Sequence, residues 1–357
     1  MIEQGHLKDT KFSNNIDLIK ISKDKKMKKY DVTGIGNALV DIEFKVKDQF
    51  FIDNSVEKGV MTLVDEERQN SLMQVIDTVE AKKQCGGSAA NSVIAVSQFG
   101  GKSFYCCKVA NDELGRFFVE DMKESGVDNN LDPDRLEDGI TGKCLVMVTD
   151  DSERTMNTFL GITQNFSVKE VNEAAIKDSK FLFIEGYLVT SPNGKEAMMR
   201  AKKIAEESST KVALTFSDPA MVKYFKEGFE DVIGPSVDLL FANEEEAMLF
   251  TGKDTLEEAR EEMKKAAKHF VITQGKNGAL IFDGDTFIDI EPYKTTAIDS
   301  NGAGDMFAGA FLYGITNGHS YASSGKLASM ASSQIVSQFG PRLKWHQAKE
   351  ILNRLNP

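Results

Sequence analysis

The stretch Asp299-Ser300-Asn301-Gly302-Ala303-Gly304-Asp305 runs directly into the apolar segment Met306-Phe307-Ala308-Gly309-Ala310-Phe311-Leu312, which is followed by Asn317-Gly318. This order predicts a glycine-rich turn that opens a helix. Small residues let the backbone approach an anion, and the free N–H groups of the first helical turn can hold phosphate oxygens. A lone acidic residue here would only favour a helix N-terminus. The full string instead indicates a catalytic site with Asp305 in that first turn.

This string resembles the second signature of the ribokinase/PfkB family of carbohydrate kinases. The resemblance implies that Asp305 is the catalytic base and that Gly302, Ala303 and Gly304 form an anion hole. The stretch Gly86-Gly87-Ser88-Ala89-Ala90-Asn91-Ser92 is similar to the first family signature. There the two glycines, Gly86 and Gly87, permit close approach of the substrate, and Asn91 offers both a donor and an acceptor. A plain strand-to-helix turn with Ser88 as N-cap is the alternative.

Two stretches in the second half of the chain agree with a nucleotide site. Asn243-Glu244-Glu245-Glu246 follows an apolar run and resembles the family's Asn-x-x-Glu element, which implies that Asn243 and Glu246 organise ATP phosphates and Mg²⁺, largely through water. Carboxylates suit Mg²⁺ because it is a hard cation that prefers oxygen and retains water. Thr273-Gln274-Gly275, with Gly278 beyond it, is similar to the ATP-contacting turn. The simpler alternative for Asn243-Glu244-Glu245-Glu246 is a solvated acidic start of a helix, and that for Thr273-Gln274-Gly275 is an ordinary turn at the end of a strand.

Further polar residues are assigned to the substrate by the same resemblance. Asn37 and Asp41 lie at the end of the first apolar run, and in the family this Asp grips vicinal hydroxyls. A carboxylate suits a diol because it accepts two hydrogen bonds and is left as a costly unpaired charge when the diol is missing. Arg154 is similar to the arginine that meets the transferred phosphate. The alternatives are that Asp41 is a solvated loop residue and that Arg154 is a cation on the surface.

Over residues 30–345 these stretches are most similar to the adenosine kinase branch of the family. We therefore expect ATP-dependent phosphorylation of a nucleoside 5′-hydroxyl, with adenosine, converted to AMP in purine salvage, as the first candidate. Fructokinase-like or ribokinase-like activity, inosine or guanosine phosphorylation and a non-catalytic nucleoside-binding relative stay open as alternatives. The expected cofactors are ATP and Mg²⁺, and a monovalent cation such as K⁺ is left open.

The fold class follows from apolar runs that alternate with charged helical stretches. The predicted strands are Tyr30–Gly36, Ser103–Val109, Phe181–Glu185, Lys211–Phe216, Val237–Ala242, His269–Thr273 and Gly278–Phe282. Such alternation predicts βαβ units and a wide, mainly parallel sheet. With the family resemblance it gives an α/β fold, a three-layer α/β/α sandwich of the ribokinase-like type.

Other parts of the chain depart from this rhythm. Asp41–Val64 and Lys143–Phe159 have alternating polarity and no helical pattern, so we expect a small β lid with strands from about 41–64 and 141–160. Residues 1–29 are charged and lack an apolar face, which predicts a disordered extension before a kinase domain at 30–357.

The composition limits which classes of partner and which cellular compartment we expect. Lys and Arg number 43 against 55 Asp and Glu, and the net charge of −12 argues against nucleic acid and anionic membranes as partners. The four cysteines, Cys85, Cys106, Cys107 and Cys144, form no C-x-x-C pair and read as buried thiols of a reducing compartment. The chain shows no signal peptide or membrane-length apolar run, so we expect a cytoplasmic protein, monomeric or homodimeric, whose ligands are ATP and a small nucleoside or sugar.

Overall fold

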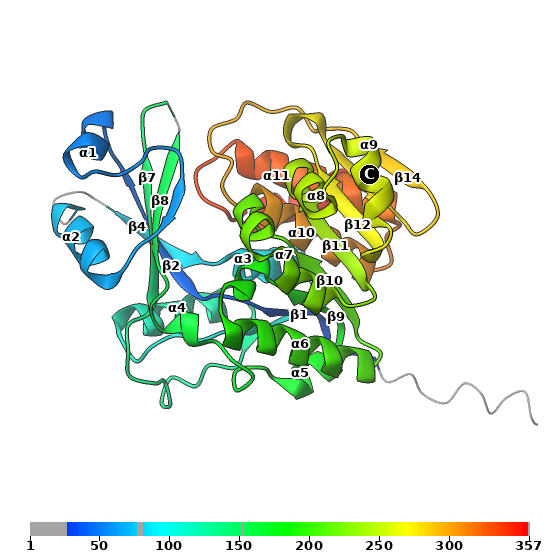
Figure 1. Cartoon of the computed structure of the whole chain (residues 1–357), viewed down its shortest axis with the longest axis horizontal. Coiled ribbons are helices and arrows are strands. Elements are labelled where there is room, and N and C mark those ends of the chain that lie inside the picture. Colours follow the sequence, from blue (N-terminus) through cyan, green and yellow to red (C-terminus); the bar gives the residue numbers. More distant parts are fainter. Residues whose placement is uncertain (1–26, 77–80, 152, 356–357) are drawn as a thin grey trace, which may run out of the picture.

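The computed structural model describes residues 27–76, 81–151 and 153–355, as a large α/β body beside a smaller lobe (Figure 1). The body is built on a nine-stranded sheet. The spatial order of its strands is β14 (Phe287–Ile290), β13 (Ala279–Phe282), β12 (Ala267–Thr273), β11 (Val237–Asn243), β10 (Lys211–Thr215), β9 (Ser179–Ile184), β1 (Tyr30–Ile35), β5 (Ser103–Cys106) and β6 (Asp128–Asn129).

Most neighbouring strands of this sheet run parallel, as the alternating sequence pattern predicts. The central strand β1 pairs in parallel with β9 on one side and β5 on the other, so that Val32 lies level with both Phe181 and Ser103. The pairs β12–β13 and β13–β14 are antiparallel, because short turns rather than helices connect these last strands. The mainly parallel three-layer arrangement is therefore confirmed.

Helices cover both faces of the sheet because alternate strand residues point to opposite sides. Phe181 and Phe183 of β9 join one core, and Leu182 and Ile184 join the other. The first face carries α3 (Ser88–Gln98), α4 (Glu113–Glu124), α10 (Ala303–Thr316), α11 (Tyr321–Val336) and α12 (Trp345–Leu355). The second face carries α5 (Glu173–Lys177), α6 (Pro192–Glu207), α7 (Pro219–Ile233), α8 (Glu244–Thr251) and α9 (Leu256–Met263).

The smaller lobe is a five-stranded sheet with two helices, on the left of Figure 1. Its strands are, in order, β3 (Met61–Leu63), β8 (Arg154–Phe159), β7 (Gly142–Val148), β2 (Leu39–Lys45) and β4 (Lys82–Gly86), and its helices are α1 (Asp48–Asp53) and α2 (Glu66–Ile76). We call this sheet the small sheet. Both predicted stretches contribute strands to it, and β4 lies outside them.

The expectation of extended chain without a helix across 41–64 is wrong in its middle part. Helix α1 occupies Asp48–Asp53, buries Phe51, and places the Phe50 ring 6.0 Å from that of Phe44 on β2. Six residues span less than two helical turns, which is too short for the apolar spacing to distinguish a helix from a strand. Tertiary packing of the two aromatic rings decides the local structure here.

Residues 1–26 of the expected N-terminal extension lie outside the described residues. The two lysines that precede β1 contact the body: Lys28 Nζ donates to Thr210 Oγ1 at 3.1 Å, and Lys29 pairs with Asp128 at 2.9 Å. None of the helices in the described ranges is long and apolar enough to cross a membrane. All four cysteines are buried and free, as predicted.

A matched pair of isoleucine substitutions tests where the core lies. Ile94 on α3 is 1% exposed and Ile52 on α1 is 72% exposed. We expect Ile94→Ala to lower the free energy of unfolding by about 2–5 kcal/mol, because it leaves a cavity between α3 and the sheet. Ile52→Ala is expected to change it by less than about 0.5 kcal/mol. Denaturant unfolding of both variants measures the difference, and equal losses would contradict this core.

Candidate active site

The glycine turn before α10 forms as the sequence predicts. Gly302 adopts the left-handed conformation, with φ of 73°, and α10 begins at Ala303. A Cβ on Gly302 would lie 2.2 Å from Pro341 Cβ, so no larger residue fits there without a shift. A Cβ on Gly304 would meet nothing within 4 Å. The turn is therefore packed from behind and open in front. Ala303 N donates to Ser300 O at 3.3 Å, whereas the N–H groups of Gly304 and Asp305 have no partner among the described residues and are free to meet an anion.

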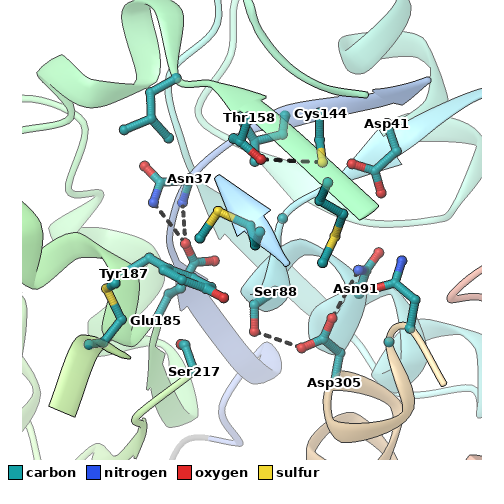
Figure 2. Close-up of a pocket in the computed structure, with 18 of the residues that line it drawn as sticks. Asn37, Asp41, Ser88, Asn91, Cys144, Thr158, Glu185, Tyr187, Ser217 and Asp305 are labelled. Atoms are coloured by element: carbon teal, nitrogen blue, oxygen red, sulfur yellow. Dashed lines mark hydrogen bonds between the residues drawn. The ribbon is translucent and has the colours of Figure 1, made fainter. Parts of the chain in front are cut away.

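Asp305 lies in the first turn of α10 and is held by two side chains of α3. Ser88 Oγ donates to Asp305 Oδ1 at 2.6 Å, and Asn91 Nδ2 donates to Oδ2 at 3.0 Å (Figure 2). Burial raises the pKa of Asp305 to about 6, and the hydrogen bonds from Ser88 and Asn91 act in the opposite direction. A carboxylate with this pKa is mostly ionised at neutral pH and able to accept a proton.

Asp305 stands where two cavities meet. The first cavity, of about 280 Å³, extends towards the small sheet and is lined by residues that include Asn37, Asp41 and Asn91. The second cavity, of about 120 Å³, extends along the ends of β11 and β12 and is lined by residues that include Asn243 and Thr273. Ser88, Ser217, Gly304 and Asp305 line both. A group bound in one cavity can therefore reach a group bound in the other beside Asp305.

The diglycine stretch shapes the first cavity through close backbone approach. A Cβ on Gly86 would lie 2.1 Å from Asp41 Oδ1, so the carboxylate of Asp41 rests directly over this glycine. Gly87 has φ of +106°, and a Cβ there would lie 2.2 Å from the carbonyl oxygen of Asn37. Both glycines are required by their surroundings, and they bring β4 and α3 against the end of β1.

Two polar side chains of the first cavity are available to a ligand. Asn91 Oδ1 is buried and has no partner among the described residues. Asp41 is 8% exposed, and burial raises its pKa to about 7, opposed by the charges of Arg342 and Arg154. A ligand with hydroxyl groups would supply the missing donors, because buried polar groups are costly when unpaired.

Asn37 is fixed by Glu185, a fully buried carboxylate at the end of β9. Glu185 Oε1 accepts from both the backbone N–H and the Nδ2 of Asn37 at 3.0 Å, and Oε2 accepts from Ala89 N at 2.8 Å. Burial raises the pKa of Glu185 to about 7. Sequence reasoning missed this residue, although an acidic side chain that ends an apolar parallel strand was a usable signal.

The second cavity contains the remaining polar residues expected at a nucleotide site. Asn243 Oδ1 accepts from Glu246 N, and Glu246 Oε2 accepts from Asn243 N, both at 2.8 Å, so the two residues cap α8 reciprocally. Thr273 lines the same cavity. Gly275 and Gly278 lie in the turn after β12, with φ of +53° and +97°, and neither lines the cavity. Their conformations alone account for glycine there.

Arg154 is not brought into either cavity. Its guanidinium pairs with Glu43 Oε2 at 2.9 Å and with Asp299 Oδ2. Asp299, the first residue of the glycine string, also accepts from Asn301 N and from Gly340 N at 3.0 Å. In this arrangement Arg154 joins the small sheet to the glycine turn that precedes α10. Contact with a transferred phosphate would require exchange of these partners and stays a prediction.

The first cavity also has an apolar wall, of which sequence reasoning expected only the part that comes from the lid stretch 41–64. Its side chains come from segments distant in sequence: Leu39, Met61, Leu63, Met156, Leu160 and Met221. Tyr187, in the turn after β9, stands beside Glu185 and Ser217 (Figure 2). None of these residues forms a motif, because only the folding of the small sheet against the body brings them together.

Comparison with known proteins agrees with this geometry. A model of the pfkB family of carbohydrate kinases matches residues 60–348. An adenosine kinase of Saccharomyces cerevisiae is 25% identical over 330 residues, which cover 86% of this chain and 95% of that protein. A 5-dehydro-2-deoxygluconokinase of Halalkalibacterium halodurans is 28% identical over 274 residues, 73% and 82% of the two chains.

Two solved structures share most of the fold. A probable sugar kinase from Rhizobium etli CFN 42 matches with a TM-score of 0.84 at 34% identity, covering 92% of this chain and 99% of that one. The adenosine kinase from Sinorhizobium meliloti matches with a TM-score of 0.84 at 32% identity, covering 91% and 99%. The fold and site define an ATP-dependent kinase of small molecules with a ribokinase-like fold. The chain belongs to the pfkB family of carbohydrate kinases.

The pKa of Asp305 predicts how the rate depends on pH. A base must be deprotonated to act, so kcat/KM is expected to be lost as pH falls through the range of about 7 to 6, where Asp41 and Asp305 become protonated. Ser88→Ala removes a hydrogen bond that lowers the pKa of Asp305 and should move the limb assigned to Asp305 to higher pH. The pH profile of kcat/KM measures this.

Ser97 provides the matched control for this experiment. It is a buried serine of the same helix, α3, and its hydroxyl donates to Gly126 O at 3.2 Å, away from Asp305. Ser97→Ala should leave the acid limb in place. Equal profiles for the Ser88 and Ser97 variants would contradict the assignment of the limb to Asp305.

Proposed function

We propose that the protein transfers the γ-phosphoryl group of ATP to the 5′-hydroxyl of a nucleoside, with adenosine as the preferred acceptor. The observation that carries this proposal is that two chemically different sets of side chains line the first cavity. Its polar part consists of Asn37, Asp41 and Asn91, and its apolar part is the apolar wall described above. The polar part can bond the hydroxyl groups of a ribose, and the apolar part can cover a flat base.

The apolar part suits an aromatic ring for physical reasons. Met61, Met156 and Met221 bring three thioethers to its wall. Methionine side chains are flexible and polarisable and make favourable contacts with aromatic rings. A free hexose or pentose carries hydroxyl groups on all sides and would leave several of them without partners against this wall.

The charge of the cavity favours a neutral acceptor. Three carboxylates, those of Asp41, Glu185 and Asp305, line it, and none of its lining residues, all of which are described, is Lys or Arg. Like charges at short range in a site with little water repel strongly. A sugar acid is therefore disfavoured relative to a neutral nucleoside, although several relatives, including the one from Halalkalibacterium halodurans, are named 5-dehydro-2-deoxygluconokinase.

In the proposed reaction the acceptor 5′-oxygen attacks the γ-phosphorus while the bond from that phosphorus to the bridging oxygen of ADP breaks. Asp305 orients the acceptor hydroxyl and takes its proton. The N–H groups of Gly302 and Gly304, at the positive end of α10, would face the charge that develops on the transferred group. Ser88 and Asn91 keep the Asp305 carboxylate aimed at the junction of the two cavities.

The second cavity fits a water-mediated Mg²⁺ beside the phosphates of ATP. Burial raises the pKa of Glu246 to about 7, with the backbone N–H of Asn243 acting against this shift and the charge of Asp218 acting in the same direction, and no described cation pairs with Glu246. Among the described residues no group of three or more His, Cys, Asp or Glu side chains could hold a metal ion directly. Glu246 would therefore bind the metal through water, and the ion would neutralise phosphate charge.

A neutral sugar is the second candidate acceptor. Glu185 adds a carboxylate to the polar part of the cavity, which increases its capacity for hydroxyl groups. The solved structure from Rhizobium etli is named a probable sugar kinase. Sugar and nucleoside acceptors differ in whether the apolar wall is used, so the acceptor assay distinguishes them.

Transfer of label from γ-labelled ATP tests the proposal across adenosine, inosine, ribose, fructose and 5-dehydro-2-deoxygluconate. We expect the highest kcat/KM for adenosine. 2′-Deoxyadenosine should be poorer by up to ~10⁴-fold, because it leaves the Asp41 carboxylate partly unpaired. Faster turnover of a sugar or of the sugar acid than of every nucleoside would contradict the proposal.

Asp41→Ala provides the internal control for that comparison. It should lower kcat/KM for adenosine and shrink the difference between adenosine and 2′-deoxyadenosine, because both substrates then lack the same partner. Asp289→Ala, on the edge strand β14, removes an exposed carboxylate far from the site in the sheet order and should leave the difference unchanged. An undiminished difference in Asp41→Ala would remove Asp41 from substrate recognition.

A further inference from the structure

The segment Gly340-Pro341-Arg342, between α11 and α12, contacts both ends of the active site from behind. We propose that Arg342 is a positioning residue. It holds the end of β4, which leads into Gly86 and Gly87, in place at the end of the site where the acceptor binds. Its neighbours support the Gly302–Gly304 turn, here called the anion-binding turn, at the end where the phosphate binds. Its kinetic readouts rest on the proposed function. No sequence motif marks this residue.

The phosphate end of the contact involves the two residues before Arg342. Gly340 N donates to Asp299 Oδ2 at 3.0 Å. Pro341 packs so closely on Gly302 that a Cβ there would lie 2.2 Å from Pro341 Cβ. Gly302 sets the left-handed turn that starts α10, so a shift of this segment would be transmitted to the N–H groups that face the transferred phosphoryl group.

The acceptor end of the contact is a closed ring of hydrogen bonds around the peptide groups of Cys85. Cys85 N donates to Asp121 Oδ2 at 3.0 Å, Arg342 Nη1 donates to the same oxygen at 2.7 Å, and Arg342 Nη2 donates to Cys85 O. β4 is an edge strand of the small sheet. Arg342 and Asp121 thus satisfy backbone groups of β4 that no neighbouring strand pairs.

The position of this ring in the sequence gives it a functional consequence. Cys85 directly precedes Gly86, whose Cα lies beneath the carboxylate of Asp41, and Gly87, which packs on the backbone of Asn37. The planar guanidinium fixes two directions at once, which a lysine does not. Loss of Arg342 would let the end of β4 move, and the two substrate residues rest on that strand end.

Arg342 also acts on Asp41 by charge. Of the charged groups around Asp41, Arg342 lowers its pKa most, Arg154 lowers it further, and Asp305 and Glu43 raise it. Asp121, paired with Arg342, and the thiols of Cys85 and Cys144, which stay protonated because burial raises their pKa values, are further titratable groups around Arg342 and Asp41. Removal of Arg342 should therefore raise the pKa of Asp41, so that the Asp41 carboxyl is protonated in a larger fraction of the molecules at a given pH.

Three variants separate positioning from general stability. Arg342→Gln removes both the charge and the two-pronged bonding, and Arg342→Lys keeps the charge alone. Arg260→Gln is the control, because Arg260 on α9 is a partly buried arginine that stacks 4.8 Å from the Phe287 ring, on the opposite face of the sheet. Each variant is measured for KM of adenosine, KM of ATP, kcat, the pH profile and the melting temperature.

For Arg342→Gln we expect kcat/KM for adenosine to fall by ~10-fold to ~10²-fold, because a small displacement of positioning groups is costly. KM for ATP should change little, since Asn243, Glu246 and Thr273 do not contact this segment. The acid limb should move to higher pH. Arg342→Lys should have the acid limb of the pH profile at its wild-type position, because the charge is kept, but its KM for adenosine should stay as high as in Arg342→Gln. A lower melting temperature with unchanged adenosine kinetics and pH profile, as expected of Arg260→Gln, would overturn the proposal.

Amide hydrogen exchange of the ligand-free protein tests the positioning without any assumption about substrate. Arg342→Gln should speed exchange at residues 85–91 and 300–305, and Arg260→Gln should not. If the wild-type protein phosphorylates none of the acceptors, the proposed function fails, and the exchange result alone decides the role of Arg342. Unchanged exchange in both segments would overturn that role even if the kinase activity is present.

Discussion

The structure depends on the contact between the N-terminal turns of α3 and α10, where Ser88 and Asn91 hold the carboxylate of Asp305. The two helices approach closely because Gly309 has no side chain: a Cβ there would lie 2.4 Å from Ser92 O and 2.6 Å from Ala95 Cβ. Residues more than 200 positions apart thereby share one buried site. If this contact opened, Asp305 would lose its orientation and its raised pKa together, and the two cavities would no longer meet at a single carboxylate.

Burial of carboxyl groups is the common electrostatic feature of the site. The carboxyl groups of Asp41, Glu185 and Glu246 have their pKa values raised to about 7, and that of Asp305 is raised to about 6. A protein keeps such groups only where other interactions stabilise them, and perturbed pKa values accordingly cluster at functional sites. Here the cost of burial is offset by backbone N–H donors at Glu185 and Glu246 and by the charges of two arginines at Asp41. Asp41 can still accept hydrogen bonds from hydroxyl groups, and Glu246 can still accept them from a hydrated cation. The same balance underlies the proposal that the acceptor is neutral rather than anionic.

Sequence reasoning succeeded where local chemistry decides the structure. The glycine turn before Asp305 and the mainly parallel sheet each follow from short-range patterns, and the structure has both. It failed where distant segments decide. Helix α1 depends on aromatic packing against β2, the partners of Arg154 come from β2 and the α10 turn, and the methionine wall combines β3, β8 and α7. Arg342 belongs with these, since nothing near it in sequence shows that it bonds to β4. Local sequence patterns do not predict contacts between side chains that are distant in the sequence.

The central claim is that Asp305 accepts the proton of an acceptor hydroxyl at the junction of the two cavities. Its most direct test is the kcat of Asp305→Asn with labelled ATP and adenosine, measured together with adenosine binding by calorimetry. Asparagine keeps the shape of the side chain and removes its basicity. We expect kcat to fall by ~10²-fold to ~10⁴-fold while the Kd for adenosine stays within a few-fold of wild type. A variant that turns over adenosine at nearly the wild-type rate would contradict it.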